Sequence, residues 1–539
     1  MIHKRERANS SAGTPGPPNY ECLAERMYKL LPFMIREDNG MNLTGKNLLE
    51  EAREYEKMAA MKTEHCPRPS FHATPPTGWM NDPNGFSLYK GEHHLFFQYH
   101  PYDIHWGPMH WGHIKTEDFI RWEMLPAALA PDKGYDYKGC FSGTAMEKDG
   151  KHILMYTGVY EEQAGSNKKE VAQVQCIAIG DGINYEKLSA NPVIDSSQLE
   201  EGFSKTDFRD PKIWEKDGIF YSLAANRSED GSGQLLLYKS ENLRQWKPCS
   251  VLLKCGSEFG RMWECPDFFE LEDKAVIVVS PQDMKAKELE FHSGNGNMYF
   301  TGNFNPSDYT FQRESYGVLD YGLDFYAPQT LKAKDGRRIL IAWMQTWDNY
   351  MTPDYFTWSG MMTIPRELTL KDGRMYQNPV RELENYRSKE VVYRNIRLQG
   401  ITKLEGISGR EIDLTLEFLN SDYRGFQLEF AAGGDEYTAL HYEPVGGILT
   451  FDRKYSGIRR DAICERQISA KGEGLKIRII LDKYSAEVFV NDGEKVMTSI
   501  FFTSLEAKDI RFLADGCVYM NIVKYDIMVS GEKAYGIYK

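Results

Sequence analysis

Apolar and polar residues alternate at a period of two along most of the chain, a pattern typical of half-buried β-strands. The exception is TGKNLLEEAREYEKMAAM, residues 44–61, where apolar positions from Leu48 to Tyr55 follow helical spacing and share one face. Thr44 is placed to cap the first turn of this helix through its hydroxyl. We therefore predict an all-β protein with one short N-terminal helix within residues 44–66.

A strand–turn–strand unit recurs five times between residues 82 and 345. Each copy joins one strand through a tight turn to a more apolar strand, and successive turns lie about 60 residues apart. The copies are DPNGFSLYKGEHHLFFQYHP, SGTAMEKDGKHILMYTGV, DPKIWEKDGIFYSLAANR, PDFFELEDKAVIVVSPQ and APQTLKAKDGRRILIAWMQ. Units of this length with roughly four strands are typical of propeller blades, so we predict a five-bladed β-propeller over residues 67–368. A large β-sandwich with similar hairpins is the alternative.

The last part of the chain is predicted to form a second domain. Residues 396–539 again alternate at a period of two and contain a hairpin turn at Asn491-Asp492-Gly493. We predict an antiparallel β-sandwich here, joined to the propeller by a linker over residues 369–395. Residues 1–43 include SSAGTPGPP and are predicted to be a disordered extension.

Composition and charge exclude several classes of function. The 65 Lys and Arg residues against 78 Asp and Glu give a net charge of −13, whereas nucleic-acid binding requires a basic face. No apolar run approaches the ~20 residues that span a membrane, and the N-terminus lacks the apolar stretch of a secretory signal. The nine cysteines are odd in number and include no C-x-x-C pair, which predicts a cytoplasmic protein without a disulfide framework.

Three acidic residues stand near the starts of the first, third and fourth repeats: Asp82 in WMNDPNG, Asp210 in FRDPK and Glu264 in WECPD. The first strand of each blade lines the channel of a propeller, so we expect these carboxylates at one mouth of it. Glycosidic cleavage requires such a pair, because one carboxyl group protonates the leaving oxygen while another attacks or activates water. A single Asp-Pro more often makes a simple turn, but recurrence in three repeats favours the catalytic interpretation.

Side chains near these motifs complete the predicted site. Asn81, Gln98 and Arg209 are expected to bind sugar hydroxyls, and Ser142, which has no nearby histidine base, is expected to donate a hydrogen bond. The predicted aromatic walls are Trp79, Trp106, Trp263 and Trp343. HWGPMHWGH carries three histidines, but no zinc motif has this spacing, so we predict neither a metal nor a cofactor.

The three acidic motifs, in this order, resemble those of glycoside hydrolase family 32, which includes invertases, fructan hydrolases and bacterial sucrose-6-phosphate hydrolases. The segments FFQYHP, WGPMHWGH, CFSG, DFYAPQ and MMTIPREL are similar to that family as well. The resemblance extends from about Leu48 through the predicted sandwich. It implies a propeller joined to a sandwich, and a retaining mechanism on β-D-fructofuranosides such as sucrose or sucrose 6-phosphate.

The resemblance also implies roles for individual residues. Asp82 looks like the nucleophile on the anomeric C2 of fructose, and Glu264 looks like the general acid and base. Asp210, with Arg209, looks like the pair that holds ring hydroxyls and stabilises the transition state. The other implied positions are the fructose-pocket contacts Asn81, Gln98, Trp106, Phe141 and Ser142, and Asp320 and Asp324 near the leaving-group side.

Two alternatives fit the same motifs. The first is a fructan hydrolase or fructosyltransferase on the same scaffold, because hydrolysis and transfer differ only in what enters the acceptor site. The second is an inactive propeller that binds sugars, which the presence of all three acids disfavours. In each case the expected partner is a small sugar; the sequence predicts no oligomeric state.

Overall fold

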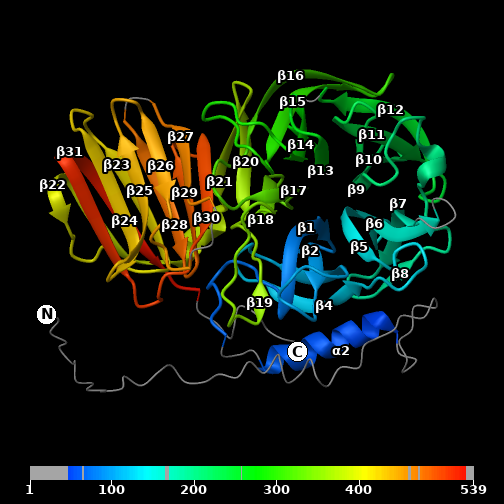
Figure 1. Ribbon diagram of the computed structural model, residues 1–539, viewed down its shortest axis with the longest axis horizontal. Coiled ribbons are helices and arrows are strands. Elements are labelled where there is room, and N and C mark those ends of the chain that lie inside the picture. Colours follow the sequence, from blue (N-terminus) through cyan, green and yellow to red (C-terminus); the bar gives the residue numbers. More distant parts are fainter. Residues whose placement is uncertain are drawn as a thin grey trace, which may run out of the picture.

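The structure of the chain is a computed structural model that describes residues 47–62, 66–163, 169–256, 258–458, 463–471 and 474–529. Two β-rich domains lie side by side, the first five sheets in one and the strands after residue 387 in the other (Figure 1). Among the described helices, none combines the length and apolar character that crossing a membrane requires. The predicted extension 1–43 and Thr44 lie outside the described residues.

One α-helix, α2 (Leu48–Lys62), precedes the first strand and lies against the propeller (Figure 1). Its cap is Asn47, whose Oδ1 accepts a 2.9 Å hydrogen bond from the backbone N–H of Leu49. The buried Glu56 accepts a 2.9 Å hydrogen bond from the backbone of β4 (Glu123–Leu129). The predicted helix is therefore present, and this polar contact fixes it to the first blade.

The five predicted repeats form five sheets around a channel, which confirms the propeller. Their first strands, innermost in each blade, contact one another in a closed ring. In blade order the strands are β1 (Gly78–Tyr89), β2 (Glu92–His100), β3 (His110–Thr116) and β4; β5 (Gly139–Lys148), β6 (Lys151–Gln163), β7 (Lys169–Gly180) and β8 (Tyr185–Lys187); β9 (Phe208–Lys216), β10 (Ile219–Arg227), β11 (Gly233–Ser240) and β12 (Lys247–Lys254); β13 (Met262–Leu271), β14 (Lys274–Gln282), β15 (Met298–Asn305) and β16 (Thr310–Val318); and β17 (Tyr326–Lys332), β18 (Arg338–Trp343), β20 (Arg366–Lys371) and β21 (Arg374–Pro379). The two-residue β19 (Trp358–Ser359) adds to β1 in parallel.

The fifth blade ends later than predicted. Strands β20 and β21 form its outer hairpin, so the propeller extends to Pro379, and the linker predicted over residues 369–395 is largely strand. The turn of this hairpin contains Gly373, whose φ of 74° is a backbone conformation that glycine adopts without steric cost. The connection between the domains is the short 3-10 helix η2 (Arg381–Tyr386).

The second domain is the predicted antiparallel sandwich. Its long strand β31 pairs with β24 through its first half and with β23 through its second half, so it takes part in both layers. The apolar side chains between the layers form one continuous core. The strands are β22 (Arg387–Thr402), β23 (Ile412–Phe418), β24 (Gly425–Gly433), β25 (Glu436–Glu443), β26 (Ile448–Asp452), β27 (Glu465–Ser469), β28 (Lys476–Asp482), β29 (Ser485–Val490), β30 (Lys495–Ile500) and β31 (Asp509–Ile527).

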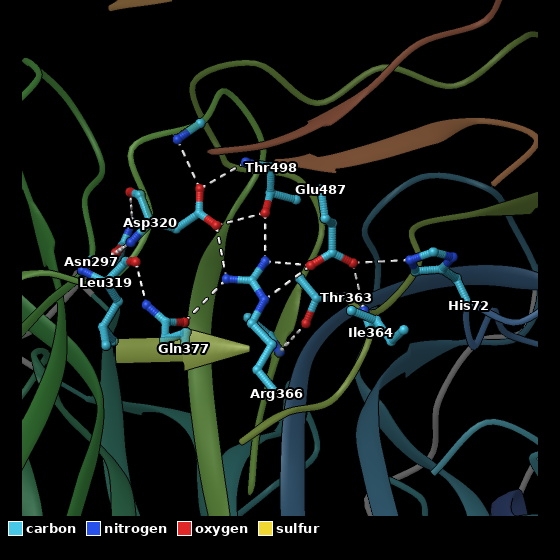
Figure 2. A network of polar contacts seen from close by, with 12 residues as sticks. His72, Asn297, Leu319, Asp320, Thr363, Ile364, Arg366, Gln377, Glu487 and Thr498 are labelled. Atoms are coloured by element: carbon cyan, nitrogen blue, oxygen red, sulfur yellow. Dashed lines mark hydrogen bonds and ion pairs between the residues drawn. The ribbon is translucent and has the colours of Figure 1, made fainter. Parts of the chain in front are cut away.

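A buried network of charged side chains joins the two domains (Figure 2). Arg366, at the start of β20, is fully buried and donates from Nη1 to Oδ2 of Asp320 at 2.9 Å. On the sandwich side its Nε donates to Oε2 of Glu487 at 3.0 Å, and its Nη2 donates to Oγ1 of Thr498 at 2.6 Å. One guanidinium thus compensates carboxylates from both domains in an interior where an unpaired charge is strongly destabilising.

His72 extends this network toward the strand that carries Asp82 (Figure 2). Its ring nitrogens lie 2.8 Å from Oδ2 of Asp482 and 3.0 Å from Oε1 of Glu487. Burial lowers the pKa of His72, but hydrogen bonds to the two carboxylates outweigh burial and raise this pKa to about 9. The protonated imidazole therefore fixes the segment before β1 to the sandwich.

Asp320 and Asp324 belong to this interface and lie outside the predicted leaving-group side. Asp320 is 3% exposed and pairs with Arg366, while Asp324 is 0% exposed and accepts a 2.6 Å hydrogen bond from Nη1 of Arg453. The backbone N–H of Ile500 donates to Asp324 as well, at 2.9 Å. The prediction for these two residues is corrected, since buried ion pairs between the domains occupy both carboxylates.

Candidate active site

Each of the five inner strands contains a β-bulge. In β9, for example, Asp210 and Pro211 together oppose a single residue of β10. The bulged residues are Asn81 and Asp82, Ser142, Asp210 and Pro211, Cys265 and Pro266, and Ala327 and Pro328. A bulge leaves the ladder locally and re-aims its side chains, so these five interruptions build a site where the inner strands converge.

The bulges also show which positions of the inner strands are structurally equivalent. In three inner strands the first bulged residue has a positive φ and precedes a proline: Asp210 (62°), Cys265 (47°) and Ala327 (52°). Cys265 is therefore the equivalent of Asp210 in the fourth blade, and Glu264 occupies the position before it. The two residues equivalent to Glu264 are Arg209 and Tyr326, and both bind it.

Asp82 is held through one of its two carboxylate oxygens. Ser142 Oγ donates a 2.6 Å hydrogen bond to Oδ2 of Asp82, and the Sγ of Cys265 lies 3.5 Å from the same oxygen. The backbone N–H of Cys265 donates to Oδ2 of Asp210 at 2.9 Å, which joins the two aspartates through one residue. The other oxygen of Asp82, Oδ1, is buried and has no hydrogen-bond partner among the described residues. The lone pairs of Oδ1 are therefore not bound by a hydrogen-bond donor of the described residues.

Glu264 is bound through both of its oxygens. Arg209 Nε donates to Oε1 at 3.0 Å, and the hydroxyl of Tyr326 donates to Oε2 at 2.6 Å. Arg209 also donates from Nη1 to Oδ1 of Asp207 at 3.0 Å, which fixes the guanidinium. The Glu264 side chain keeps 15% of its surface exposed. It is thus oriented by its neighbours and still partly exposed to solvent.

Burial and repulsion raise the pKa values of both aspartates. Burial raises the pKa of Asp82, and the charge of Glu264 adds to this effect, whereas the Ser142 hydrogen bond opposes it. Burial also raises the pKa of Asp210 to about 7, against the opposing charge of Arg209. Burial lowers the pKa of Arg209, but the surrounding carboxylates outweigh it and raise that pKa. Because three carboxyl groups lie beside one guanidinium, retention of one proton among the three carboxyl groups is favoured. Acid-assisted cleavage requires a proton at the site.

The structure brings the other predicted polar contacts to the same place. Asn81 accepts a 2.7 Å hydrogen bond from Nε1 of Trp79, and Gln98 donates to the backbone of β5 at 3.0 Å. Trp106 is 50% exposed and meets the ring of Phe141 edge to face, with centroids 6.0 Å apart. Asn81 and Gln98 are therefore held in place, and Trp106 presents an aromatic surface to solvent beside Phe141.

Three of the four tryptophans predicted as sugar-stacking walls are buried instead. Trp79 and Trp343 are 1% and 0% exposed, and both pack beneath the partly exposed Trp347. Trp263 lies in the core of the third and fourth blades, with its Nε1 donating to the carbonyl of Phe259 at 2.8 Å. The period-two pattern that places these residues in strands also buries their large side chains.

Sequence reasoning missed four residues of this site. Tyr326 and Cys265 contact the acids directly, and Trp347 and Tyr350 cover Trp79 from a loop after β18. The sequence contains a signal for Tyr326 and Cys265. Cys-Pro in the fourth repeat and Ala-Pro in the fifth repeat match the Asp-Pro of the third repeat. The loop residues follow no repeat, and therefore gave no signal.

The three histidines of residues 105–113 do not come together. His105 is exposed and pairs with Asp103, whereas His113 is buried and lies 2.9 Å from a ring nitrogen of His94. No group of three or more His, Cys, Asp or Glu residues in the described part of the chain has the geometry to hold a metal ion.

Carboxyl groups that converge from the inner strands of a five-bladed propeller provide the acid and the nucleophile that a glycosidase needs. The family model "Glycosyl hydrolases family 32 N-terminal domain" matches residues 72–379, and "Glycosyl hydrolases family 32 C terminal" matches residues 382–528. The chain belongs to glycosyl hydrolase family 32, and it is an enzyme of the β-fructofuranosidase type.

Curated relatives and solved structures agree with this membership. The raffinose invertase of Escherichia coli is 36% identical, over 84% of this chain and 94% of its own length. The sucrose-6-phosphate hydrolase of Bacillus subtilis (strain 168) is 34% identical, over 88% and 97% of the two chains. The structure of a Bombyx mori GH32 beta-fructofuranosidase superposes with a TM-score of 0.77 at 31% identity, covering 90% and 99%, and a mutant of it was solved in complex with sucrose.

Proposed function

We propose that the enzyme releases fructose from the non-reducing end of small β-D-fructofuranosides, sucrose or sucrose 6-phosphate, with retention of configuration. The arrangement of Asp82 and Glu264 carries this proposal: one carboxylate is buried with a free oxygen, and the other is oriented by Arg209 and Tyr326 near solvent. The names of the E. coli and B. subtilis relatives support the substrate class.

In the first step Asp82 acts as the nucleophile and Glu264 as the general acid. Oδ1 of Asp82 forms a bond to C2 of the fructosyl unit while the bond from C2 to the leaving oxygen breaks. Glu264 transfers its proton to that oxygen, so the leaving sugar departs as a neutral alcohol. The hydrogen bond from Ser142 stabilises the ionised form of Asp82 that makes the attack.

In the second step water replaces the leaving sugar. Glu264, now a carboxylate, removes a proton from the water as the water oxygen bonds to C2 and the bond to Asp82 breaks. Fructose is released, Asp82 is again a carboxylate, and Glu264 is again protonated. Two successive inversions at C2 give net retention.

Asp210 and Arg209 are proposed to hold the fructosyl ring during both steps. Asp210 is held by the backbone N–H of Cys265, and Arg209 is paired with Glu264, so both are fixed before substrate arrives. Fixed groups stabilise the positive charge of an oxocarbenium-like transition state without reorganising. Asn81, Gln98, Phe141 and Trp106 are proposed to contact the ring hydroxyls and its apolar edge.

The cysteines support a cytoplasmic location as part of this proposal. None of the eight cysteines in the described residues forms a disulfide, and Cys265 lies inside the active site as a free thiol. Thiols persist in reducing compartments, where small imported sugars rather than external polymers are the available substrates.

Fructose release from sucrose, sucrose 6-phosphate, inulin and levan, measured side by side, tests the proposal. We expect release from the first two and little from the polymers. Asp82→Ala and Glu264→Gln should each lower kcat by about 1,000-fold or more, because each removes a chemical step. Glu270→Gln, an exposed acid on the same strand β13, is the control and should change nothing. Unchanged activity in either acid variant would overturn the assignment.

A further inference from the structure

The helix α2 contacts two adjacent blades of the propeller, although it precedes residues 72–379, which the family model of that domain matches. Arg53 Nε donates a 2.8 Å hydrogen bond to the carbonyl of Ala127 in β4, and the N–H of Ala127 donates to Glu56 at 2.9 Å. From the same guanidinium, Nη2 donates at 3.0 Å to the carbonyl of Ile183, in the turn between β7 and β8. These polar contacts fix the helix to the outer edges of the first and second blades.

Tyr55 of this helix contacts the loop 101–109, which connects β2 to β3. Its ring meets the ring of Tyr102 edge to face, with centroids 4.9 Å apart and an interplanar angle of 64°, and both rings are partly buried. Tyr102 meets two histidine rings in the same way, His100 at 5.9 Å and His110 at 5.8 Å. These histidines are the last residue of β2 and the first residue of β3. Tyr102 thus lies between the helix and both ends of the loop.

The His100 ring supports the backbone on both sides of Trp106. Its Nδ1 donates a 2.9 Å hydrogen bond to the carbonyl of His105, since a carbonyl oxygen can only accept. On the other side, a β-carbon at Gly107 would lie 2.3 Å from a ring atom of His100, so the glycine backbone packs directly on the imidazole. Trp106 itself is 50% exposed. Its position therefore depends on His100, whose ring packs in turn against Tyr102.

We infer that α2 positions the Trp106 ring for the fructosyl unit, and that Tyr55 is the positioning residue that transmits this effect through Tyr102. The inference rests on the proposed function, in which Trp106 contacts the fructosyl ring. Trp106 belongs to the first blade and meets Phe141 of the second blade edge to face, with centroids 6.0 Å apart. Because α2 is fixed to the same two blades, it holds an exposed ring in place before substrate binds, which lowers the entropic cost of binding.

A double-mutant cycle between Tyr55 and Trp106 tests the inference, with KM and kcat measured on sucrose or sucrose 6-phosphate, whichever the wild type hydrolyses better. Tyr55→Ala should raise KM by about three- to tenfold and change kcat by less than about twofold, because it weakens binding of substrate and transition state alike. Trp106→Ala should raise KM by about tenfold. The double variant should have the KM of Trp106→Ala alone, since the helix acts through this ring. Tyr55→Phe, which keeps the aromatic edge, should restore the KM of the wild type.

Met58→Ala is the matched control, because Met58 lies on the same helix, is 56% exposed and should change KM by less than about twofold. Should Tyr55→Ala fail to fold, Tyr55→Leu keeps an apolar side chain on the helix and tests the same expectation. An unchanged KM in the Tyr55 variant would overturn the inference, and so would an effect that multiplies in full with that of Trp106→Ala. Both outcomes leave the proposed function intact, whereas absence of fructose release by the wild type would overturn the proposed function itself.

Discussion

The hydroxyl of Ser142 donates a 2.6 Å hydrogen bond to Oδ2 of Asp82, and this bond joins the first strands of two adjacent blades. The bond opposes the burial that raises the pKa of Asp82, so it stabilises the ionised carboxylate. A buried nucleophile of this kind has to be ionised and yet reactive. Placing Ser142 and Cys265 on Oδ2 alone meets both conditions, because Oδ1 of Asp82 accepts no hydrogen bond from the described residues.

Ser142→Ala is expected to lower kcat/KM by roughly 10- to 100-fold, the range for a hydrogen bond to a charged group. Because the bond lowers the pKa of Asp82, its loss raises that pKa, and the acid limb of the pH profile should move to higher pH. Ser142→Thr keeps a hydroxyl and is the control. An acid limb that stays in place in the alanine variant would show that Ser142 does not stabilise the carboxylate.

Asp267 is predicted to set the spacing of the blades that carry the acids. Its buried carboxylate pairs with Lys212 Nζ at 2.7 Å and accepts two 2.7 Å hydrogen bonds from Thr330, which joins β9, β13 and β17. Asp267→Asn leaves the lysine uncompensated and should lower the free energy of unfolding by about 3–5 kcal/mol. The exposed pair of Lys216 and Glu270 joins the same two blades, β9 and β13, so Lys216→Ala should cost less than about 1 kcal/mol. Equal costs in urea unfolding would contradict this assignment.

The buried neutral histidines are predicted to lower stability as the pH drops below about 6.5, in opposition to Asp82 and Asp210, whose raised pKa values favour the folded state in acid. Burial lowers the pKa of His94 to about 4, and it lowers the pKa values of His113 and His152 well below their usual range. These imidazoles are neutral when folded but bind protons in the unfolded chain, so acid favours unfolding. His94 alone contributes on the order of 3 kcal/mol between pH 7.5 and pH 4. In His94→Asn the urea midpoint should depend less on pH across this range than in the wild type, whereas the exposed His105→Ala should leave that dependence unchanged.

Arg366→Met is predicted to destabilise the whole chain. The substitution leaves Asp320 buried without its cation and leaves Glu487 paired with His72 alone, at a cost of about 3–5 kcal/mol. The matched control is Arg374→Met, because the pair of Arg374 with Glu494 crosses the same domain boundary with the arginine 70% exposed. The control should cost less than about 1 kcal/mol. Similar melting temperatures for the two variants would show that the buried network does not join the domains.

The architecture was largely predictable because its signals are local. Strand periodicity, turn residues and the five repeats all depend on neighbours within one hairpin, and each recurs in the structure. The end of the propeller was placed too early, since β20 and β21 have no counterpart in the repeat that was aligned.

The site was predictable where the chain itself positions a residue, and less so where distant segments do. Asp82, Asp210 and Glu264 come together because each lies at or beside a bulge of an inner strand. The prediction for Asp320 and Asp324 is wrong because Thr498 and Arg453, which bind them from the sandwich, lie more than 100 residues away in the chain. The sequence predicts Trp79 and Trp343 as open aromatic surfaces, since nothing in the local pattern shows that Trp347 covers them.

Trapping the covalent intermediate tests the central claim most directly. Glu264→Gln, incubated with β-D-fructofuranosyl fluoride, should accumulate a fructosyl-enzyme, because fluoride departs without a proton while no base remains to activate water. Peptide mass spectrometry should then place one fructosyl residue on Asp82. A fructosyl residue on Asp210, or release of fructose with inverted configuration and no adduct, would contradict the assignment of Asp82 as nucleophile.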